Sequence, residues 1–290
     1  MYKDPAPAAP PAATAPPKEY VCLRVARAPV IDGELDDPAW QEAPWSDDFV
    51  DIEGPTKPAP RFRTRMKMAC DDAALYVAAE LEEPELCATL TKHDSVIFHD
   101  DDFELFLDPD GDRDVYGELE LNEFDTTWDL LLTKPYRDGG LPINGWEIAG
   151  LKTAVALHGT VNDPRDVDRG WSVEMALPWP ALTELMHDGR PPRDGDRWRI
   201  DFSRVEWRKE VAADGTYRRS PGAREDNWVW SPQGVVDMHR PERWGFVRFA
   251  TPYGVRVTTM PRCAEPLLLP EVRTRIELLP TTSSIDGVWK

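Results

Sequence analysis

Short apolar runs separated by clusters of Gly, Pro and Asp repeat along the chain from Glu19 to about Ala250. The runs have the length of β-strands, and several alternate apolar and polar residues with a period of two, which is typical of half-buried strands. The clearest predicted strands span 61–69, 75–81, 103–108, 116–122, 128–133, 171–177, 198–207 and 246–250. So many short strands in one continuous stretch predict a single all-β domain, an antiparallel β-sandwich or barrel.

Turn and helix signals complete this pattern. The sequence DPDGD at 108–112 separates two runs rich in Phe, Leu and Tyr, so it predicts a tight hairpin turn. Asp37 precedes Pro38, a residue suited to the first position of a helix, which predicts a short helix over 36–42. A second short helix is predicted over 180–187, where Leu and Met recur at helical spacing.

The two ends of the chain differ in composition from this central region. Residues 5–17 contain only Pro, Ala and Thr, a composition that favours extended conformations and does not pack into a core. We therefore predict a disordered tail or linker over 1–18 and the β-domain over 19–250. Beyond this domain the alternation fades, and residues 251–290 are predicted to form a C-terminal appendage.

The charge balance excludes one class of partner. The chain has 34 basic and 53 acidic residues, a net charge of −19, whereas nucleic-acid binding relies on Lys and Arg. We therefore expect no nucleic-acid partner. No apolar stretch reaches the roughly 20 residues of a membrane-spanning helix, and the sequence as given shows no secretory signal. These features leave the compartment and the oligomeric state open.

Eight segments, in order along the chain, carry the most specific information. They are VIDGELDDPAW (30–40), DDAALYVAAELEEP (71–84), DDDFELFLDPDGD (100–112), YGELELN (116–122), WSVEMALPWPAL (171–182), GDRWRIDFSRVEW (195–207), WVWSP (228–232) and MHRPERWGFVRF (238–249). Together they resemble the carbohydrate-binding family 9 modules and the wider group of DOMON-like β-sandwiches. The resemblance implies a sandwich of immunoglobulin-like or jelly-roll type. It also implies non-catalytic binding of a polysaccharide or oligosaccharide, as an accessory to glycoside hydrolysis in carbohydrate catabolism outside the cytoplasm.

The same resemblance implies a position for the sugar. In the family modules associated with xylanases, two Trp rings enclose a terminal sugar, and a Glu and an Arg bond its hydroxyls. Aligned by their motifs, the first Trp, the Glu, the Arg and the second Trp fall on Phe98, Glu104, Glu120 and Met238. Only the Glu is retained, and one aromatic is replaced in kind. We expect a cleft bordered by these residues, with an altered sugar preference because Glu120 replaces a charged donor by an acceptor.

Other aromatic residues provide alternatives to this cleft. Trp228 and Trp230, at i and i+2, share one face of a strand, so they predict either a flat aromatic platform for a sugar or a cap on the core. Trp128 and Trp146 are further candidates for an exposed position. Three more Trp residues are expected in the core, namely Trp40, Trp179 and Trp244.

The region from Asp94 to Asp125 carries 13 carboxylates and one Arg. Such a density is unfavourable unless cations or solvated turns relieve the repulsion. Family 9 modules carry structural calcium, so the resemblance implies Ca²⁺ ligands among Asp100, Asp102, Asp108, Asp110 and Asp112. The spacing does not form an EF-hand, and a solvated acidic hairpin turn explains the same residues equally well.

Two alternative functions are open at this point. A glycosidase or lyase needs two carboxylates about 5–10 Å apart in a cleft, and the sequence contains no compact nucleophile motif in its favour. DOMON-like relatives hold haem through an axial Met and a His or Lys, and Met238 adjoins His239. Neighbouring strand residues point to opposite faces, so a partner would have to come from Met68, His93, His99 or His158.

Overall fold

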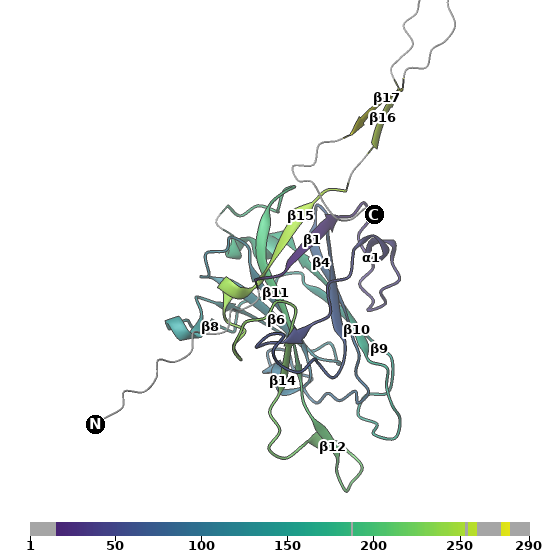
Figure 1. Ribbon diagram of the computed structural model, residues 1–290, viewed down its shortest axis with the longest axis vertical. Coiled ribbons are helices and arrows are strands. Elements are labelled where there is room, and N and C mark those ends of the chain that lie inside the picture. The colour runs from purple at the N-terminus through teal and green to yellow at the C-terminus, as the bar shows by residue number, and fades with distance from the viewer. Residues whose placement is uncertain (1–15, 187, 253–254, 260–273, 279–290) are drawn as a thin grey trace, which may run out of the picture.

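The computed structural model describes residues 16–186, 188–252, 255–259 and 274–278. Within them, 13 strands form one continuous sheet (Figure 1). One half of it contains β2 (Val50–Asp51), β5 (Phe103–Asp108), β6 (Tyr116–Leu121), β7 (Thr127–Leu132), β8 (Pro142–Ile143), β11 (Arg197–Glu206) and β14 (Asp226–Val229). The other half contains β1 (Glu19–Arg24), β3 (Thr64–Cys70), β4 (Ala74–Leu81), β9 (Lys152–Leu157), β10 (Trp171–Pro178) and β15 (Gly245–Ala250). The strand order is β8-β7-β6-β5-β11-β15-β1-β3-β4-β10-β9, with β14 on β11 and β2 on β14.

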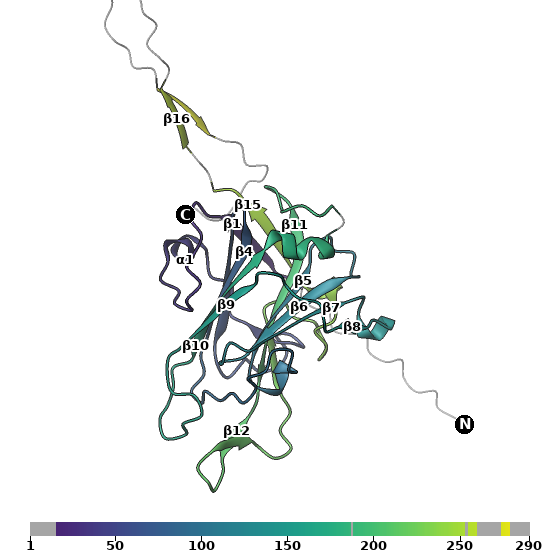
Figure 2. The same ribbon diagram turned by 180° about the vertical axis from the view of Figure 1, so that it is seen from behind.

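The sheet curls, so that its two halves enclose a common apolar core (Figure 2). Leu105 of β5 and Leu119 of β6 come from one half, and Val77 of β4 and Val173 of β10 come from the other; all four are fully buried in one cluster. Successive residues of a strand point to opposite faces. Glu104 therefore lies on the face of β5 that is turned away from this core, and that face carries the candidate site.

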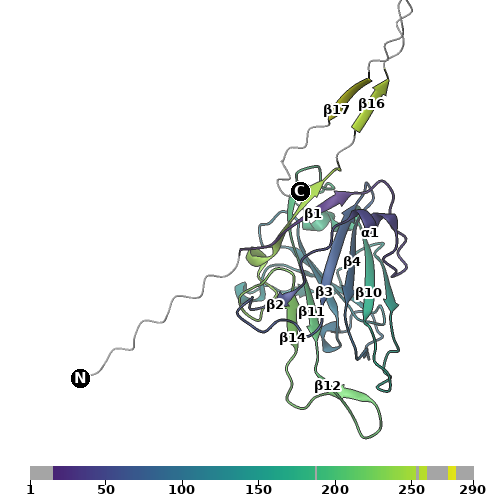
Figure 3. The same cartoon turned by 45° about the vertical axis from the view of Figure 1, so that its right-hand side comes forward.

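Strand β1 departs from the predicted antiparallel arrangement. It pairs in parallel with β15 on one side, as Figure 1 shows, and with β3 on the other, which is labelled in Figure 3. A parallel pair needs a long crossover connection, and the segment from Arg24 to Thr64 provides one for β1 and β3. The other pairings within the sheet are antiparallel, as predicted.

All eight strands predicted from alternation are present in the structure. Their bounds differ from the predicted ones by at most three residues. The strands that the prediction missed in the main sheet are β1, β2, β8, β9 and β14. The prediction also missed β12 (Lys209–Val211) and β13 (Tyr217–Arg219), which form a hairpin that projects from one end of the molecule (Figure 1).

The helical content is small, as predicted. Helix α1 (Pro38–Glu42) forms where Pro38 takes the first turn, and it buries Trp40. The helix predicted over 180–187 is instead the 3₁₀ helix η3 (Trp179–Leu185). The other 3₁₀ helices are η1 (Ile97–His99), η2 (Tyr136–Asp138) and η4 (Pro241–Arg243). Trp40, Trp179 and Trp244 are all buried, which confirms their predicted place in the core. In the described part of the chain, no helix is long and apolar enough to cross a membrane.

The predicted end segments lie mostly outside the described residues. Residues 1–15 of the predicted tail are among those not described, and the first strand begins at Glu19. In the predicted appendage, β16 (Val255–Thr259) and β17 (Thr274–Leu278) pair with each other in antiparallel fashion. Most of the remaining residues of 251–290 are not described.

Candidate functional site

A row of side chains crosses β5, β6 and β7. Glu104 of β5 pairs with Glu120 of β6, and Glu120 pairs with Trp128 of β7, in the register of these antiparallel strands. Glu118 precedes Glu120 by two residues and therefore lies on the same face of β6. Because the alternate residues of these strands face the common core, the row lies on the opposite surface of the sheet.

This row lines a cavity of about 460 Å³, which we call the acidic cleft. Four aromatic side chains from separate elements contribute to its walls: Phe98 of η1, Phe106 of β5, Trp128 of β7 and Tyr136 of η2. The other lining residues are Ile52, Glu104, Glu118, Glu120, Val205, Glu225, Asn227, Val236, Asp237, Met238 and His239. The described lining contains five acidic residues and no Lys or Arg. Its volume lies in the range of about 300–1,000 Å³ that is usual for small-ligand sites.

Burial controls the charge of the acidic cleft. The side chains of Glu104 and Glu118 are each 5% exposed, and that of Glu120 is 2% exposed. Burial raises the pKa of Glu104 to about 7. Burial, with repulsion from neighbouring carboxylates, raises the pKa values of Glu118 and Glu120 well above their ordinary range. Burial therefore favours the protonated form of these carboxyl groups, and Glu104 is partly protonated near pH 7, so the cleft presents a hydrogen-bond donor as well as acceptors.

Hydrogen bonds fix the walls of the acidic cleft. The backbone N–H of Phe98 donates to Glu120 Oε2 at 3.0 Å, and Trp207 Nε1 donates to the Phe98 carbonyl at 3.0 Å. These two bonds hold η1 against the sheet. The indole N–H of Trp128 is buried and has no hydrogen-bond partner among the described residues. A buried donor without a partner is unfavourable, so a ligand that accepts this hydrogen bond would satisfy it.

His239 is the one histidine in the described lining of the acidic cleft. Burial lowers its pKa to about 4, so its imidazole is neutral at physiological pH. Its Nδ1 lies 3.0 Å from the hydroxyl of Tyr116. The described lining of the cleft therefore has no positive charge to balance its carboxyl groups.

The structure brings together the four residues that the sequence placed around the sugar, namely Phe98, Glu104, Glu120 and Met238. The sequence did not assign Glu118, Trp128 or Tyr136 to this cleft. Glu118 was accessible to sequence reasoning, since a residue two positions before Glu120 shares its strand face. The position of Trp128 depends on the pairing of β6 with β7, and that of Tyr136 depends on the placement of η2.

The proposed platform of Trp228 and Trp230 is wrong. These side chains are 3% and 1% exposed, and both belong to the common core. They share one strand face as predicted, but that face is turned inward, where the ring of Trp230 packs against Phe202 at 6.1 Å between centroids. Trp146 is also buried, at 8% exposure, and its Nε1 donates to Glu184 at 2.9 Å.

The five predicted calcium ligands do not form one site. Asp100 accepts hydrogen bonds from the backbone N–H groups of Thr89 and Leu90, at 2.7 and 2.8 Å, and so braces the loop before β5. Asp102 lies beside Glu104 and Glu120. The other three, Asp108, Asp110 and Asp112, meet at the turn between β5 and β6. An extended strand rises about 3.3 Å per residue, so the two groups lie at opposite ends of β5.

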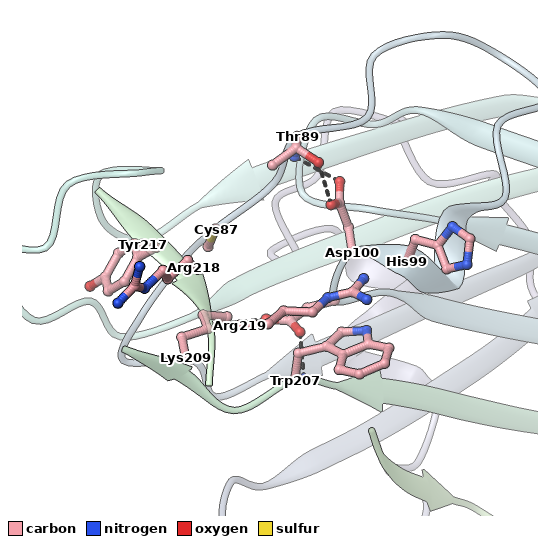
Figure 4. Close-up of a pocket in the computed structure, with 10 residues that line it drawn as sticks. Cys87, Thr89, His99, Asp100, Trp207, Lys209, Tyr217, Arg218 and Arg219 are labelled. Atoms are coloured by element: carbon pink, nitrogen blue, oxygen red, sulfur yellow. Dashed lines mark hydrogen bonds and ion pairs between the residues drawn. The ribbon is translucent and has the colours of Figure 1, made fainter. Parts of the chain in front are cut away.

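A second cavity, of about 390 Å³, lies on the other side of η1 and is shown in Figure 4. It is lined by Cys87, Thr89, His99, Asp100, Asp101, Trp207, Lys209, Tyr217, Arg218 and Arg219. Most of its charged groups are already paired within the protein. Lys209 Nζ lies 3.3 Å from Glu83 Oε1 and also contacts Asp101, and Arg218 contacts Glu210 at 2.8 Å. The guanidinium of Arg219 lies over the Trp207 ring, 3.6 Å from its centroid, so that face is covered. The acidic cleft is therefore the stronger candidate.

The residues considered for haem binding are placed differently from the prediction. Met238 and His239 lie outside any strand, and both line the acidic cleft, so the argument from opposite strand faces does not apply to them. Met68, His93, His99 and His158 contribute nothing to the described lining of this cleft. Apart from Met238, the described lining of the cleft contains no Met and no further His that could act as a haem ligand together with His239.

Comparisons with known proteins identify the family of this chain and support its fold. The chain matches the family model described as carbohydrate family 9 binding domain-like over residues 31–245. No curated protein matches it. A candidate carbohydrate-binding protein from Bacteroides uniformis has a similar structure, with a TM-score of 0.57 at 17% identity, over 80% of this chain and 99% of that chain.

Two solved structures of a family 9 carbohydrate-binding module from Caldicellulosiruptor kristjanssonii are also similar. The complex with cellotriose has a TM-score of 0.51 at 18% identity, over 87% of this chain and 100% of that chain. The complex with glucose has a TM-score of 0.52 at 19% identity, over 81% of this chain and 96% of that chain. Since the family match extends over well more than half of the sequence, the protein belongs to the carbohydrate family 9 binding domain-like family.

Proposed function

We propose that the protein binds a carbohydrate in the acidic cleft and does not cleave it. The observation that carries this proposal is the combination of aromatic walls and buried carboxyl groups around one cavity of sugar size. The family assignment supports it, as do the sugar complexes of the structurally similar modules.

The cleft has the chemistry that a pyranose ring requires. The rings of Phe98, Trp128 and Tyr136 are apolar surfaces that can cover the C–H face of a sugar. Glu104 and Glu120 accept hydrogen bonds from hydroxyls in their ionised form and donate one in their protonated form.

The charge of the lining limits the class of sugar. The described lining has no Lys or Arg to pair with a ligand carboxylate, so burial of such a group in the cleft would cost its solvation without a compensating charge. We therefore infer a preference for neutral saccharides over those that contain uronic acids. We propose that this binding serves as an accessory to glycoside hydrolysis in carbohydrate catabolism.

A glycan array followed by calorimetric titration tests this proposal. We expect neutral oligosaccharides such as cello- or xylo-oligosaccharides to bind, and pectin fragments not to bind. The variants Phe98→Ala and Trp128→Ala should each lose stacking energy of about 1 kcal/mol or more, while Phe124→Ala, which removes an exposed ring outside the cleft, should bind as the wild type. Unchanged affinity in both cleft variants would exclude this site, and release of new reducing ends would establish the enzymatic alternative.

Two finer assignments complete the proposal. We infer that the curled sheet is a β-sandwich of the immunoglobulin-like, DOMON-like jelly-roll type, because its two halves share one core. We also propose a structural Ca²⁺ at the turn between β5 and β6. Carboxylate oxygens of Asp108, Asp110 and Asp112 lie within 4.8 Å of one another there, and a flexible loop of hard oxygen ligands suits this ion.

A further inference from the structure

Four ionisable side chains converge at a point outside both cavities. His93 and Asp94 belong to the loop before η1, Asp129 lies on β7, and Glu147 lies in the loop after β8. One potential ligand atom from each lies within 4.8 Å of the others. Three segments that are distant in sequence thus bring a nitrogen and three carboxylate oxygens together.

The distances within this group resemble those between the ligands of a small metal ion. His93 Nε2 lies 3.3 Å from Glu147 Oε1, 3.4 Å from Asp94 Oδ1 and 3.7 Å from Asp129 Oδ1. In a tetrahedral zinc site with bonds of about 2.0–2.1 Å, neighbouring ligand atoms are about 3.3–3.4 Å apart. The first two distances match this value, and the third exceeds it by a few tenths of an ångström.

The imidazole of His93 is oriented as in a metal site. Its Nδ1 lies 3.0 Å from the backbone carbonyl of Thr127. A carbonyl oxygen only accepts, so Nδ1 carries the hydrogen and the lone pair of a neutral ring is on Nε2, which faces the three carboxylates. Ligating histidines commonly donate their other N–H to a backbone carbonyl in this way. In the metal-free chain a proton on Nε2 would be hydrogen-bonded by Glu147, whose Oε1 and Oε2 both lie 3.3 Å away, and a metal ion would take the place of that proton.

Asp129 provides an independent observation. Its side chain is 2% exposed. Oδ2 accepts a hydrogen bond from the backbone N–H of Ile148 at 2.5 Å, but Oδ1 is buried without a hydrogen-bond partner among the described residues. This oxygen is the one that faces His93 Nε2. A buried carboxylate oxygen without a partner is costly, and a bound cation would satisfy it.

We propose that His93, Asp94, Asp129 and Glu147 bind a divalent transition-metal ion, with zinc as the ion that fits best. Imidazole nitrogen favours zinc and related ions over calcium and magnesium. Calcium takes six to eight oxygen ligands, whereas this group provides four atoms in a compact arrangement. The ion would connect the loop before η1 with β7. Phe98 of η1 and Trp128 of β7 both line the acidic cleft, so the metal site and the cleft would share these neighbouring elements.

The test uses the full chain, stripped of metal by a chelator and then titrated with zinc by calorimetry in the presence of excess calcium. We expect one zinc ion to bind per chain. His93→Ala and Glu147→Gln should each weaken zinc binding by about 100-fold or more, because even an outer hydrogen-bond partner of a ligand is worth about 10–100-fold. Glu147 is 60% exposed, so its variant should fold. His99→Ala removes a histidine outside the group and serves as the matched control.

Cobalt provides a second measurement. Bound Co²⁺ should give the intense visible absorption of a tetrahedral nitrogen and oxygen site, and this absorption should be absent from His93→Ala. The proposal is overturned if the stripped chain binds no zinc, if both variants bind it as well as the wild type, or if calcium displaces it at equal concentration.

Discussion

Glu104 is a buried carboxyl group that faces a cavity, and its pKa has a consequence for stability. Its pKa in the folded protein is about 7, against an ordinary value of 4.5. Between these values the folded protein holds a proton that the unfolded chain has released. The free energy of unfolding should therefore fall as the pH rises from about 4.5 to about 7, by up to about 3 kcal/mol for this group.

Glu104→Gln tests this dependence. The amide cannot ionise, so the variant should gain about 1–3 kcal/mol relative to the wild type when the pH is raised from about 5 to about 8. Urea denaturation at the two pH values measures the difference. If the free energies of unfolding of Glu104→Gln and the wild type differ by the same amount at both pH values, Glu104 ionises normally in the folded protein.

Lys209 is one of the two cations, with Arg204, of a buried ionic group. Its Nζ lies 3.3 Å from Glu83 Oε1, contacts Asp101, and donates to the Glu85 carbonyl at 2.8 Å. Lys209→Met would leave Asp101 buried without its cation, while Glu83 would keep Arg204 at 2.7 Å, so we expect a loss of about 3–5 kcal/mol in the free energy of unfolding. Lys57→Met, which breaks an exposed pair with Glu53, should cost much less. Equal effects in thermal or urea denaturation would contradict this difference.

At the scale of single residues, the sequence predicts a position where a motif or a strand period determines it. The family motif placed Phe98, Glu104 and Glu120 around one cavity. Spacing alone put Trp228 and Trp230 on one face, but it did not determine which face, because large aromatic rings fit a core as well as a binding platform. The group around His93 was beyond prediction, since its members come from three segments that only the folded chain brings together.

At the scale of elements, the turn between β5 and β6 carries three of the five predicted calcium ligands, Asp108, Asp110 and Asp112. The carboxylate of Asp108 accepts hydrogen bonds from the backbone N–H groups of Gly111 and Arg113, at 2.9 and 3.2 Å, which gives the turn its shape. Burial raises the pKa of Asp108 to about 7, so a cation there would restore its ionised form.

Millimolar calcium should therefore raise the melting temperature of the wild type. An ion at 100 times its dissociation constant stabilises the folded state by about 2.7 kcal/mol. The double variant Asp110→Asn and Asp112→Asn should lose this response, while Glu147→Gln should keep it. A wild type that melts identically in calcium and in chelator would identify the loop as a solvated turn.

The elements themselves were predictable where alternation is strong. The eight predicted strands all occur, because each buries one face in the common core. Strand β1 has residues typical of a strand, but its partners were not predictable from the sequence. Its Glu19 pairs with Phe246, which lies near the other end of the domain in sequence. A pairing over such a separation depends on the closure of the whole sheet and not on local sequence.

At the scale of the whole molecule, we expect the main sheet to unfold as one cooperative unit, because its 13 strands are continuous. Its first strand begins at Glu19 and its last, β15, ends at Ala250, while β16 and β17 pair only with each other. Limited proteolysis should therefore yield one stable fragment of about residues 20–250, identified by mass spectrometry. Two independently stable fragments, or a stable fragment that lacks β1, would contradict a single unit.

The parallel pairing of β1 with β15 also determines how the domain responds to a pulling force. Tension that enters at the start of β1 and leaves at the end of β15 would slide the two strands past each other, because they run in the same direction. In this shear geometry the hydrogen bonds of the ladder, from Glu19 with Phe246 to Leu23 with Ala250, share the load and must break together. A domain pulled from both sides by flanking segments of its own chain would thus resist the force at the pairing of β1 with β15.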